Sequence, residues 1–465
     1  MPYKNTVVLL ICLMVGATWS FAQPKINSPY SRIGIGDLTN KNFGGINGMA
    51  DISSAFHDPF HLNFQNPASL SFLKVTAFEV GLNARYGKLE SGDAIQKGWS
   101  GNLAYLSLGF PMKNTESRIL DRDESPFFWG MGFDLRPYSL VGYDVDALEV
   151  HPVVDTINYN YTGTGGTYQI LWGNGVRYKN FAMGANLGFV FGTFNNDRMV
   201  SFANLEEPYA DFFNDDSSVR GFIWNLGAQY HHVFRKGTDA EERERNLPQL
   251  TVGAWGHSSH NIDIQTSRLA RRFNGPYSTN NVSASDTIFA GTFSDRTFSA
   301  KLPAEFGIGV MYQFVNRTDD GKNTQWRFGM DYSTAAWSTF ENGARPNEKF
   351  ENSYRFALGA ELLPDNSPAY VKSYASKIRY RIGGFYAKDP RVALGNNKSL
   401  TNYGITLGLG LPIIRKGGDN SFLNFALELG TLQGDADGSL KDTYGKLTLG
   451  ITFNDKNWFK KRKFN

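Results

Sequence analysis

The sequence predicts an all-β fold, a transmembrane outer-membrane β-barrel of about 14 antiparallel strands whose lumen is plugged by the N-terminal segment. Three observations predict it: alternating strand-length stretches, a secretory signal, and connections of unequal length. The clearest stretch sets Phe306, Ile308, Val310, Tyr312 and Phe314 against Glu305, Gly307, Gly309 and Gln313. Such period-two alternation gives a strand one apolar face. In a soluble sandwich the polar face would meet water, whereas in a membrane barrel the apolar face meets lipid.

The first residues have the pattern of a secretory signal. Lys4 precedes an apolar run at 7–17, and residues 20–22, Ser-Phe-Ala, form a cleavage pattern. The run is too short to cross a bilayer as a helix. We therefore expect residues 1–22 to be a signal peptide. The only cysteine, Cys12, lies within it, so the remaining chain offers no disulfide framework and no thiolate metal ligand.

The composition favours one large barrel domain over several soluble domains. Aromatic residues make up 14% of the 465 residues, and 49 residues are glycine, a mixture that suits strands, tight turns and interfacial aromatic girdles. No Pro/Ser-rich linker or charge block divides the chain. A formal net charge of +3 argues against a nucleic-acid partner, which would need a basic face. The sequence has no second hydrophobic stretch of membrane-helix length, so entry into a bilayer requires a closed barrel.

The alternation can be followed from end to end as fourteen candidate strands. They lie at 74–87, 99–112, 127–143, 166–178, 180–194, 220–235, 248–270, 303–315, 324–336, 353–363, 375–387, 401–412, 420–431 and 443–454. The connections after odd-numbered strands include long polar ones at 144–165, 195–219 and 271–302, while those after even-numbered strands are mostly shorter. This contrast is typical of an outer-membrane barrel whose termini are both periplasmic.

The segment before the first strand is predicted to fill the lumen. About fourteen strands enclose more space than the wall's side chains can fill, so something must plug it. Residues 23–73 lack sustained alternation, yet Phe56, Phe60 and Leu62 make them more apolar than a disordered periplasmic tail, which is the alternative. We therefore assign 23–73 to a plug, 74–454 to the barrel and 455–465 to a basic C-terminal tail.

Several motifs resemble those of outer-membrane proteins related to the long-chain fatty-acid transporter FadL. Residues 27–38, NSPYSRIGIGDL, resemble the mature start of these proteins, and Asn66-Pro67-Ala68 resembles the motif that ends their plug. Further matches are PYS with GY at 137–143, GTGG at 163–166, LP at 302–303, DY with WS at 331–338, and GLGLP at 408–412. The resemblance implies a fourteen-stranded barrel with an N-terminal hatch that takes up hydrophobic small molecules. It extends to the outer-membrane shuttle subunit of the type IX secretion machinery, so the fold does not fix the function.

Candidate ligand and gate residues are Pro137, Gly142 and the motif Asn66, Pro67 and Ala68. Pro137 falls within the third strand, where it cannot donate a ladder hydrogen bond, so a kink or bulge is expected there. The resemblance implies that a kink in the third strand forms a lateral exit to the membrane, and Gly142 lies close by in the same strand. The alternative is a bulge that only shapes the barrel.

The alternation also predicts a set of lumen charges. They are Glu79, Arg85, Glu305, Arg379, Arg381 and Glu428. The arginines could hold a ligand carboxylate by bidentate hydrogen bonds, or the six residues could pair with one another and with the plug. The seven histidines suggest no metal site, and no nucleophile or acid pair accompanies them. We therefore expect no metal, no cofactor and no enzymatic activity.

The sequence is compatible with three functions. The leading one is passive uptake of fatty-acid-like hydrophobic or amphipathic molecules, with the outer-membrane lipid bilayer and a small-molecule ligand as partners. The runner-up is a non-transporting barrel subunit of a larger outer-membrane assembly, such as a secretion or insertion machinery, which requires an outer-membrane protein partner. The third is a soluble secreted β-protein. A continuous apolar pocket favours transport, whereas a lumen packed with plug and charge pairs favours the accessory role.

Overall fold

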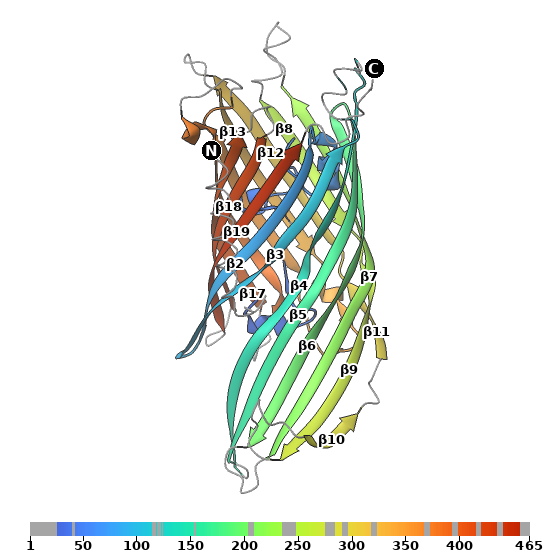
Figure 1. Cartoon of the computed structure of the whole chain (residues 1–465), viewed down its shortest axis with the longest axis vertical. Coiled ribbons are helices and arrows are strands. Elements are labelled where there is room, and N and C mark those ends of the chain that lie inside the picture. Colours follow the sequence, from blue (N-terminus) through green and yellow to red (C-terminus); the bar gives the residue numbers. More distant parts are fainter. Residues whose placement is uncertain are drawn as a thin grey trace, which may run out of the picture.

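Antiparallel strands close on themselves in this computed structural model (Figure 1). The last strand pairs with the first, from Asp455 opposite Thr76 to Lys441 opposite Glu90, and this pairing completes the ring. The structure describes residues 26–39, 42–113, 118, 122, 124–152, 155–202, 209–234, 248–274, 284–290, 296–317, 323–366, 373–392, 399–414, 420–434 and 440–455. The predicted signal peptide and residues 456–465 of the predicted tail lie outside them. The predicted all-β closed barrel is confirmed.

The ring has fourteen strand positions, counted over the described strands. The chain bends at residues 258–259 and at 303–304, so that β8 with β9, and β11 with β12, each share one position. The members are β2 (Thr76–Ser91), β3 (Ala94–Pro111), β4 (Phe127–His151), β5 (Asp155–Tyr178), β6 (Phe181–Phe202), β7 (Tyr209–Val233), β8 (Gln249–His257), β9 (His260–Asn274), β11 (Arg296–Leu302), β12 (Glu305–Arg317), β13 (Asn323–Ala335), β15 (Ser353–Leu363), β16 (Arg379–Val392), β17 (Ser399–Ile414), β18 (Asn420–Gly434) and β19 (Lys441–Asp455). Short strands β1 (Asp37–Leu38), β10 (Ala284–Ala290) and β14 (Glu341–Asn342) add to this ring.

The barrel is apolar on its outer face and polar inside, as the alternation predicts. Phe306 on β12 and Ile382 on β16 are each 57% exposed. Charged side chains of the inner face are buried, with Glu79 at 0% and Arg381 at 4% exposure. A continuous belt of exposed apolar side chains is unfavourable in water and is the surface that a bilayer requires.

Strands on one side of the barrel are longer than predicted. β4 to β7 have 22 to 25 residues each, whereas a bilayer crossing takes about 9–11. The expected loops at 144–165 and 195–219 therefore largely continue the sheet, and 271–302 contains β10, β11 and the end of β9. The expectation of loops was wrong because it rested on polarity, and a strand outside the bilayer needs no apolar face. Figure 1 shows these strands projecting at the end opposite to the start of β2, which we call the far end.

The N-terminal residues run inside the ring. Residues 42–73, which we call the plug, contain α2 (Gly44–Asn47) and η3 (Pro67–Phe72), and residues 26–39, the N-terminal segment, contain η2 (Pro29–Arg32). Plug residues Ile46, Met49 and Ile52 are fully buried and share a cluster with Met311 and Phe385 of the wall. None of the helices in the described residues is long and apolar enough to cross a membrane.

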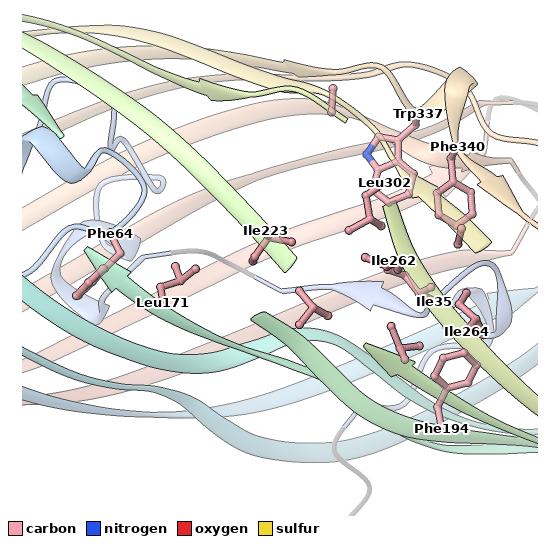
Figure 2. Packing of buried hydrophobic residues seen from close by; sticks show 14 of the residues in the cluster. Ile35, Phe64, Leu171, Phe194, Ile223, Ile262, Ile264, Leu302, Trp337 and Phe340 are labelled. Atoms are coloured by element: carbon pink, nitrogen blue, oxygen red, sulfur yellow. The ribbon is translucent and has the colours of Figure 1, made fainter. Parts of the chain in front are cut away.

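A second apolar cluster lines the lumen between the plug and the far end. Figure 2 shows Phe64 of the plug beside Leu171 at one end of this cluster, and Phe194 beside Ile264 at the other. All four side chains are at most 8% exposed. The apolar part of the lumen is therefore packed by side chains.

Candidate functional site

The predicted plug motif lies at the contact between the plug and two wall strands. Asn66 is the N-cap of η3, and its side-chain oxygen accepts a hydrogen bond from the Ala68 amide at 3.2 Å. Its Nδ2 donates to the Ser54 carbonyl at 2.6 Å and to two wall carbonyls, Ala228 on β7 at 3.1 Å and Ala254 on β8 at 3.2 Å. Pro67 is the first residue of η3, where its missing N–H costs nothing. One buried amide thus ties two plug turns to the wall.

Wall amides bind the plug backbone at three further points. Asn186 on β6 donates to the Phe64 carbonyl at 2.6 Å, and Asn225 on β7 donates to the Gln65 carbonyl at 2.9 Å. Gln229, also on β7, donates to the Ser54 carbonyl at 3.1 Å. A buried loop needs partners for its polar backbone groups, and here the wall supplies them.

A wall carboxylate captures the other side of the same plug turn. Asp331 on β13 accepts hydrogen bonds from the backbone amides of Ser53 at 2.7 Å and Ser54 at 2.9 Å, and its second oxygen accepts from the Ser54 hydroxyl. On the neighbouring wall, Gly253 lies so close that a Cβ there would stand 1.9 Å from the Ser54 carbonyl oxygen. The turn is therefore held by direct backbone contact as well as by hydrogen bonds.

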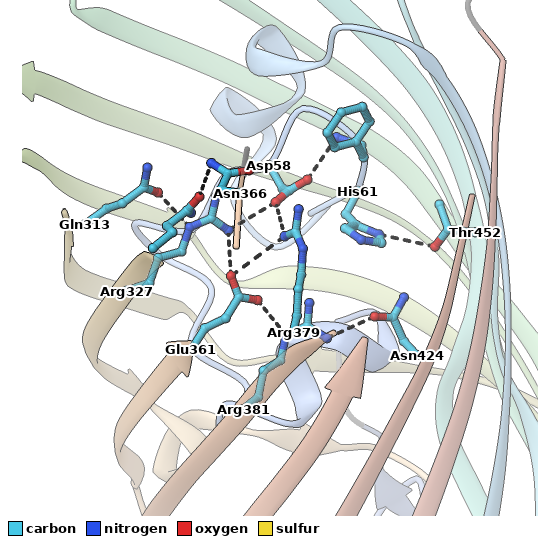
Figure 3. Close-up of polar contacts among 12 residues, drawn as sticks. Asp58, His61, Gln313, Arg327, Glu361, Asn366, Arg379, Arg381, Asn424 and Thr452 are labelled. Atoms are coloured by element: carbon cyan, nitrogen blue, oxygen red, sulfur yellow. Dashed lines mark hydrogen bonds and ion pairs between the residues drawn. The ribbon is translucent and has the colours of Figure 1, made fainter. Parts of the chain in front are cut away.

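A separate network of ion pairs joins the plug to the wall of the barrel (Figure 3). Plug residue Asp58 pairs with Arg379 at 2.8 Å and with Arg327 at 3.1 Å. Glu361 on β15 pairs with Arg381 at 2.7 Å and with Arg327 at 3.2 Å. Both carboxylates are at most 1% exposed. Of the predicted lumen charges, Arg379 pairs directly with the plug, and Arg381 joins the network through their shared partner Glu361.

Strand register explains why these wall charges meet. Gln313, Arg327, Glu361 and Arg381 stand directly opposite one another in turn across β12, β13, β15 and β16. Side chains on one face of adjacent strands at such positions are within contact distance. Gln313 accepts from Arg327 at 2.7 Å, and Arg381 ends the row by donating to Asn424 at 2.9 Å.

The other predicted lumen charges also have partners. Glu79 accepts from the Leu62 amide of the plug at 3.3 Å and lies 3.0 Å from His61 Nδ1. The remaining three have partners on wall strands: Arg85 lies 2.5 Å from Asp442, Glu428 lies 2.7 Å from Lys446, and Glu305 lies 3.6 Å from His257.

Pro137 lies where two wall strands separate. Pairing between β3 and β4 runs from Pro111 opposite Gly130 to Leu106 opposite Leu135, and β4 continues to pair with β5 as far as His151. A bulge interrupts the β4–β5 register between Pro137 and Ser139. We call the stretch beyond Leu135, where β3 and β4 part, the seam.

The N-terminal segment covers the β4 side of this seam. Asp37 and Leu38 of β1 pair with Leu140 and Ser139, and the Ser28 amide donates to the Gly142 carbonyl at 2.9 Å. A Cβ at Gly142 would stand 2.0 Å from the Ile26 carbonyl oxygen. The same N-terminal segment thus contacts both Pro137 and Gly142, and neither residue shares a hydrogen bond with Asn66 among the described residues.

The cavities beside the plug are small or polar. One of about 50 Å³ lies between Phe64, Leu171 and Ile223, with Arg136 and Asn186 in its wall. Another, of about 170 Å³, is lined by Asp51, Glu305, Asp331 and Arg355 among others. Sites for drug-sized ligands have roughly 300–1,000 Å³. Two larger cavities lie toward the far end. The one of about 540 Å³ is lined mostly by hydroxyl and amide side chains, and the one of about 610 Å³ is lined by many charged side chains.

Several contact residues were not singled out from the sequence. Arg327 and Glu361 alternate with exposed Phe328 and with Leu362, so the alternation itself could have assigned them to the lumen. Asp58 and His61 fall in a segment without periodicity, and only the fold shows their partners. Within the described residues, no group of three or more His, Cys, Asp or Glu side chains could hold a metal ion.

The sequence and the fold of this chain are similar to different sets of known proteins. A model of the BamG family matches residues 3–465. A FadL homologue of Pseudomonas aeruginosa has a TM-score of 0.50 at 12% identity, covering 90% of this chain and 99% of that chain. The toluene transporter TbuX of Ralstonia pickettii has a TM-score of 0.51 at 13% identity, covering 89% and 99%. No curated protein matches the sequence. The FadL-like resemblance is confirmed for the fold, and identities this low show the fold alone.

Proposed function

This chain belongs to the BamG family, and from that premise we propose that it is a non-transporting barrel subunit of the BAM insertion machinery. The family name associates its members with that assembly. The partners are then other proteins of the machinery and the outer-membrane bilayer, and the chain has no catalytic reaction of its own. We further propose that its strands cross the outer membrane and that the end where β2 begins faces the periplasm.

The observation that carries the proposal is the fixed plug. Asn66 and Asp331 hold one turn of the plug, and Asp58 joins it to Arg327 and Arg379. Removing one partner of a buried ion pair costs about 3–5 kcal/mol, so displacing the plug would break several such contacts together. The cavities of about 50 and 170 Å³ beside it are too small for a fatty-acid-like ligand. These features favour a scaffold over a passage.

The projecting strands supply a surface that an assembly can use. β4 to β7 extend well past the length of a bilayer crossing, and β4 carries exposed apolar residues near its end, with Leu148 at 73% and Val150 at 79% exposure. Exposed apolar side chains beyond the lipid belt are typical of protein contact sites. This arrangement favours a partner at the far end.

The experiment has two arms. The first is purification of the chain from membranes in a mild detergent, followed by quantitative mass spectrometry of what remains bound. We expect BAM proteins in near-stoichiometric amounts and no co-purifying fatty-acid-like lipid. The second is depletion of the chain, after which other outer-membrane barrels should lose heat-modifiable mobility. Stoichiometric lipid without a protein partner, and normal barrel assembly after depletion, would contradict the proposal.

A plug fixed to the wall by a disulfide distinguishes the accessory role from transport, because only transport requires the plug to move. The only cysteine lies in the predicted signal peptide, so Ser54→Cys with Asp331→Cys introduces one pair at a hydrogen-bonded contact. The reduced form of the same variant is the matched control. Barrel assembly that is equal in the oxidised and reduced forms supports the accessory role.

Uptake of hydrophobic small molecules is the second candidate, and the seam favours it. β3 and β4 part beyond Leu106 and Leu135, next to the bulge at Pro137, and only the N-terminal segment lies along the β4 edge in the described residues. A wall that parts at this point offers a lateral route to lipid. The similar fold of a toluene transporter agrees with such a route.

Two variants test this second function. Pro137→Val restores a backbone N–H at the bulge, and Gly142→Ala displaces the N-terminal segment from the seam. If the seam is a route, both variants change uptake of a radiolabelled fatty acid, and the oxidised plug variant abolishes it. Unchanged uptake in all three, with uptake no greater than in cells lacking the chain, removes transport as a function.

A further inference from the structure

The largest of the far-end cavities lies against the N-terminal segment. It has a volume of about 610 Å³, within the range of small-molecule sites. Its wall combines η2, the far parts of β6, β7 and β9, and the connection between β13 and β15. The plug anchors lie elsewhere, so this cavity is separate from the contacts that fix the plug.

Three cations in this wall have no direct ion pair with a carboxylate of the described residues: Arg32, Arg198 and Lys349. The Arg32 guanidinium lies 4.5 Å from the ring centroid of Tyr161, and that of Arg198 lies 4.2 Å from the centroid of Phe213. Stacking on an aromatic ring orients a guanidinium and leaves its N–H groups available at the edge. All three side chains belong to exposed residues that line the cavity.

The carboxylates of the same wall are already engaged. Asp215 pairs with Arg268 at 3.1 Å, and Asp197 accepts from Asn214 at 2.8 Å. Glu348 accepts from the Gly34 amide at 3.0 Å and pairs with Arg345 at 3.4 Å. Five cationic and three anionic side chains line the cavity, which leaves it with two excess positive charges.

One buried amide nitrogen in the wall, Nδ2 of Asn196, lacks a partner within the described part of the chain. Asn196 is 9% exposed, its oxygen accepts from the Tyr143 hydroxyl at 2.7 Å, and its Nδ2 has no hydrogen-bond partner among the residues that the structure describes. A buried donor left unsatisfied costs about 1–3 kcal/mol. An oxygen of a bound ligand would satisfy it, and this requirement is independent of the excess charge.

We propose that this cavity binds a sugar that carries two or more phosphate groups. Arg32, Arg198 and Lys349 would bind the phosphates, because guanidinium and ammonium groups are the usual phosphate ligands. Asn196 would donate to a sugar or phosphate oxygen. The ligand is either a soluble sugar phosphate or the phosphorylated sugar headgroup of a glycolipid, and both sources have the same chemistry.

The test uses the full chain in a detergent without sugar groups, with fructose 1,6-bisphosphate as the soluble probe and calorimetry as the readout. We expect saturable binding that weakens as salt rises, and none with fructose. The Arg32→Gln/Arg198→Gln variant should bind at least tenfold more weakly. Arg220→Gln is the matched control, because Arg220 lies outside this cavity and its pair with Asp263, at 4.0 Å, is exposed. Heat-modifiable mobility of each variant checks its folding.

A second arm separates the two sources. Nanodiscs of phosphatidylcholine with and without lipid A, a bisphosphorylated disaccharide on acyl chains, are titrated against the wild type and the double variant. Binding of lipid A that the double variant loses assigns the glycolipid, and binding of the soluble probe alone assigns the free sugar phosphate. If neither probe binds saturably, or if the double variant binds as tightly as the wild type, the proposal is wrong.

Discussion

Asp58 in the plug and Arg379 on β16 form a buried ion pair, with 2.8 Å between the carboxylate Oδ2 and Nη1 of the guanidinium. Arg327 shares the same carboxylate oxygen at 3.1 Å. The pair lies at 0% and 9% side-chain exposure, so water contributes little to either charge. The plug thus supplies a carboxylate that neutralises buried arginines of the barrel wall.

We therefore predict that Asp58→Asn loosens the plug. The change keeps the size of the side chain but leaves Arg379 and Arg327 with Glu361 as their shared carboxylate. Breaking one side of a buried pair costs about 3–5 kcal/mol. Limited proteolysis of the plug in detergent and ion conductance in planar bilayers should both rise.

An exposed carboxylate provides the control for this change. Asp263 lies 4.0 Å from Arg220, with both side chains more than half exposed. Exposed pairs contribute about 0–1 kcal/mol. Asp263→Asn should leave proteolysis and conductance at wild-type levels, and equal effects of the two substitutions would show that the buried network does not hold the plug.

A second prediction concerns the plug motif. Asn66→Ala removes the η3 cap and takes one donor from each of the Ser54, Ala228 and Ala254 carbonyls, of which Ser54 keeps the bond from Gln229. Loss of an N-cap costs about 0.5–2 kcal/mol, and each lost hydrogen bond adds about 0.5–1.5 kcal/mol. Hydrogen exchange of the plug amides should therefore accelerate.

Asn160→Ala is the comparison for the motif. Asn160 donates to Asp144 and Asp146 on exposed strand extensions, at 3.0 and 2.9 Å. Its loss should leave exchange in the plug unchanged. Wild-type exchange in the Asn66 variant would mean that the motif serves another purpose than anchoring.

The wall of the barrel was predictable because its signal is local. Alternation, as in Phe306 against Glu305, needs no knowledge of distant residues, and closure follows from the need to pair every edge. Strand ends were less predictable, since the alternation fades once a strand leaves the bilayer. That is why residues 144–165 were expected to be a loop.

The contacts of the lumen needed information that a sequence pattern does not hold. Alternation places Arg381 inside the barrel, but its pairing with Glu361 depends on the register between β15 and β16. Asp58 lies in a plug without periodicity, so its meeting with Arg379 depends on how the whole segment folds. Predicting charges was therefore possible, whereas predicting pairs was not.

A third prediction tests direct contact between wall and plug. Gly253→Ala would place a Cβ 1.9 Å from the Ser54 carbonyl oxygen, which belongs to the backbone and can move only with the plug. Overpacking of this kind costs about 1–3 kcal/mol. We expect a lower midpoint in thermal unfolding and faster plug proteolysis.

Gly384→Ala is the matched control, because it is the same Gly→Ala substitution on another strand of the wall. A Cβ there would stand 3.7 Å from the Gly404 carbonyl oxygen, an ordinary contact. It should unfold as the wild type does. A similar loss of stability in both variants would attribute the effect to strand glycines in general instead of to the plug.

The last prediction concerns pH and the connection between β13 and β15. Burial raises the pKa of Glu348 above its ordinary value, although Arg345 and the Gly34 amide act in the opposite direction. The folded state therefore holds this proton at a pH where the unfolded chain, with a glutamate pKa of about 4.3, has released it. By linkage, this group's contribution favours folding at low pH and is lost as pH rises from that value through the folded pKa.

Glu348→Gln removes the titration and keeps an oxygen that can accept from Gly34. Proteolysis of the connection, measured from pH 4 to 8, should increase with pH more steeply in the wild type than in this variant. The difference between the two curves isolates Glu348 from every other carboxylate, because all other groups titrate in both proteins. Parallel curves would mean that the contacts of the Glu348 carboxylate, with Arg345 and the Gly34 amide among them, stabilise it as fully as water does in the unfolded chain.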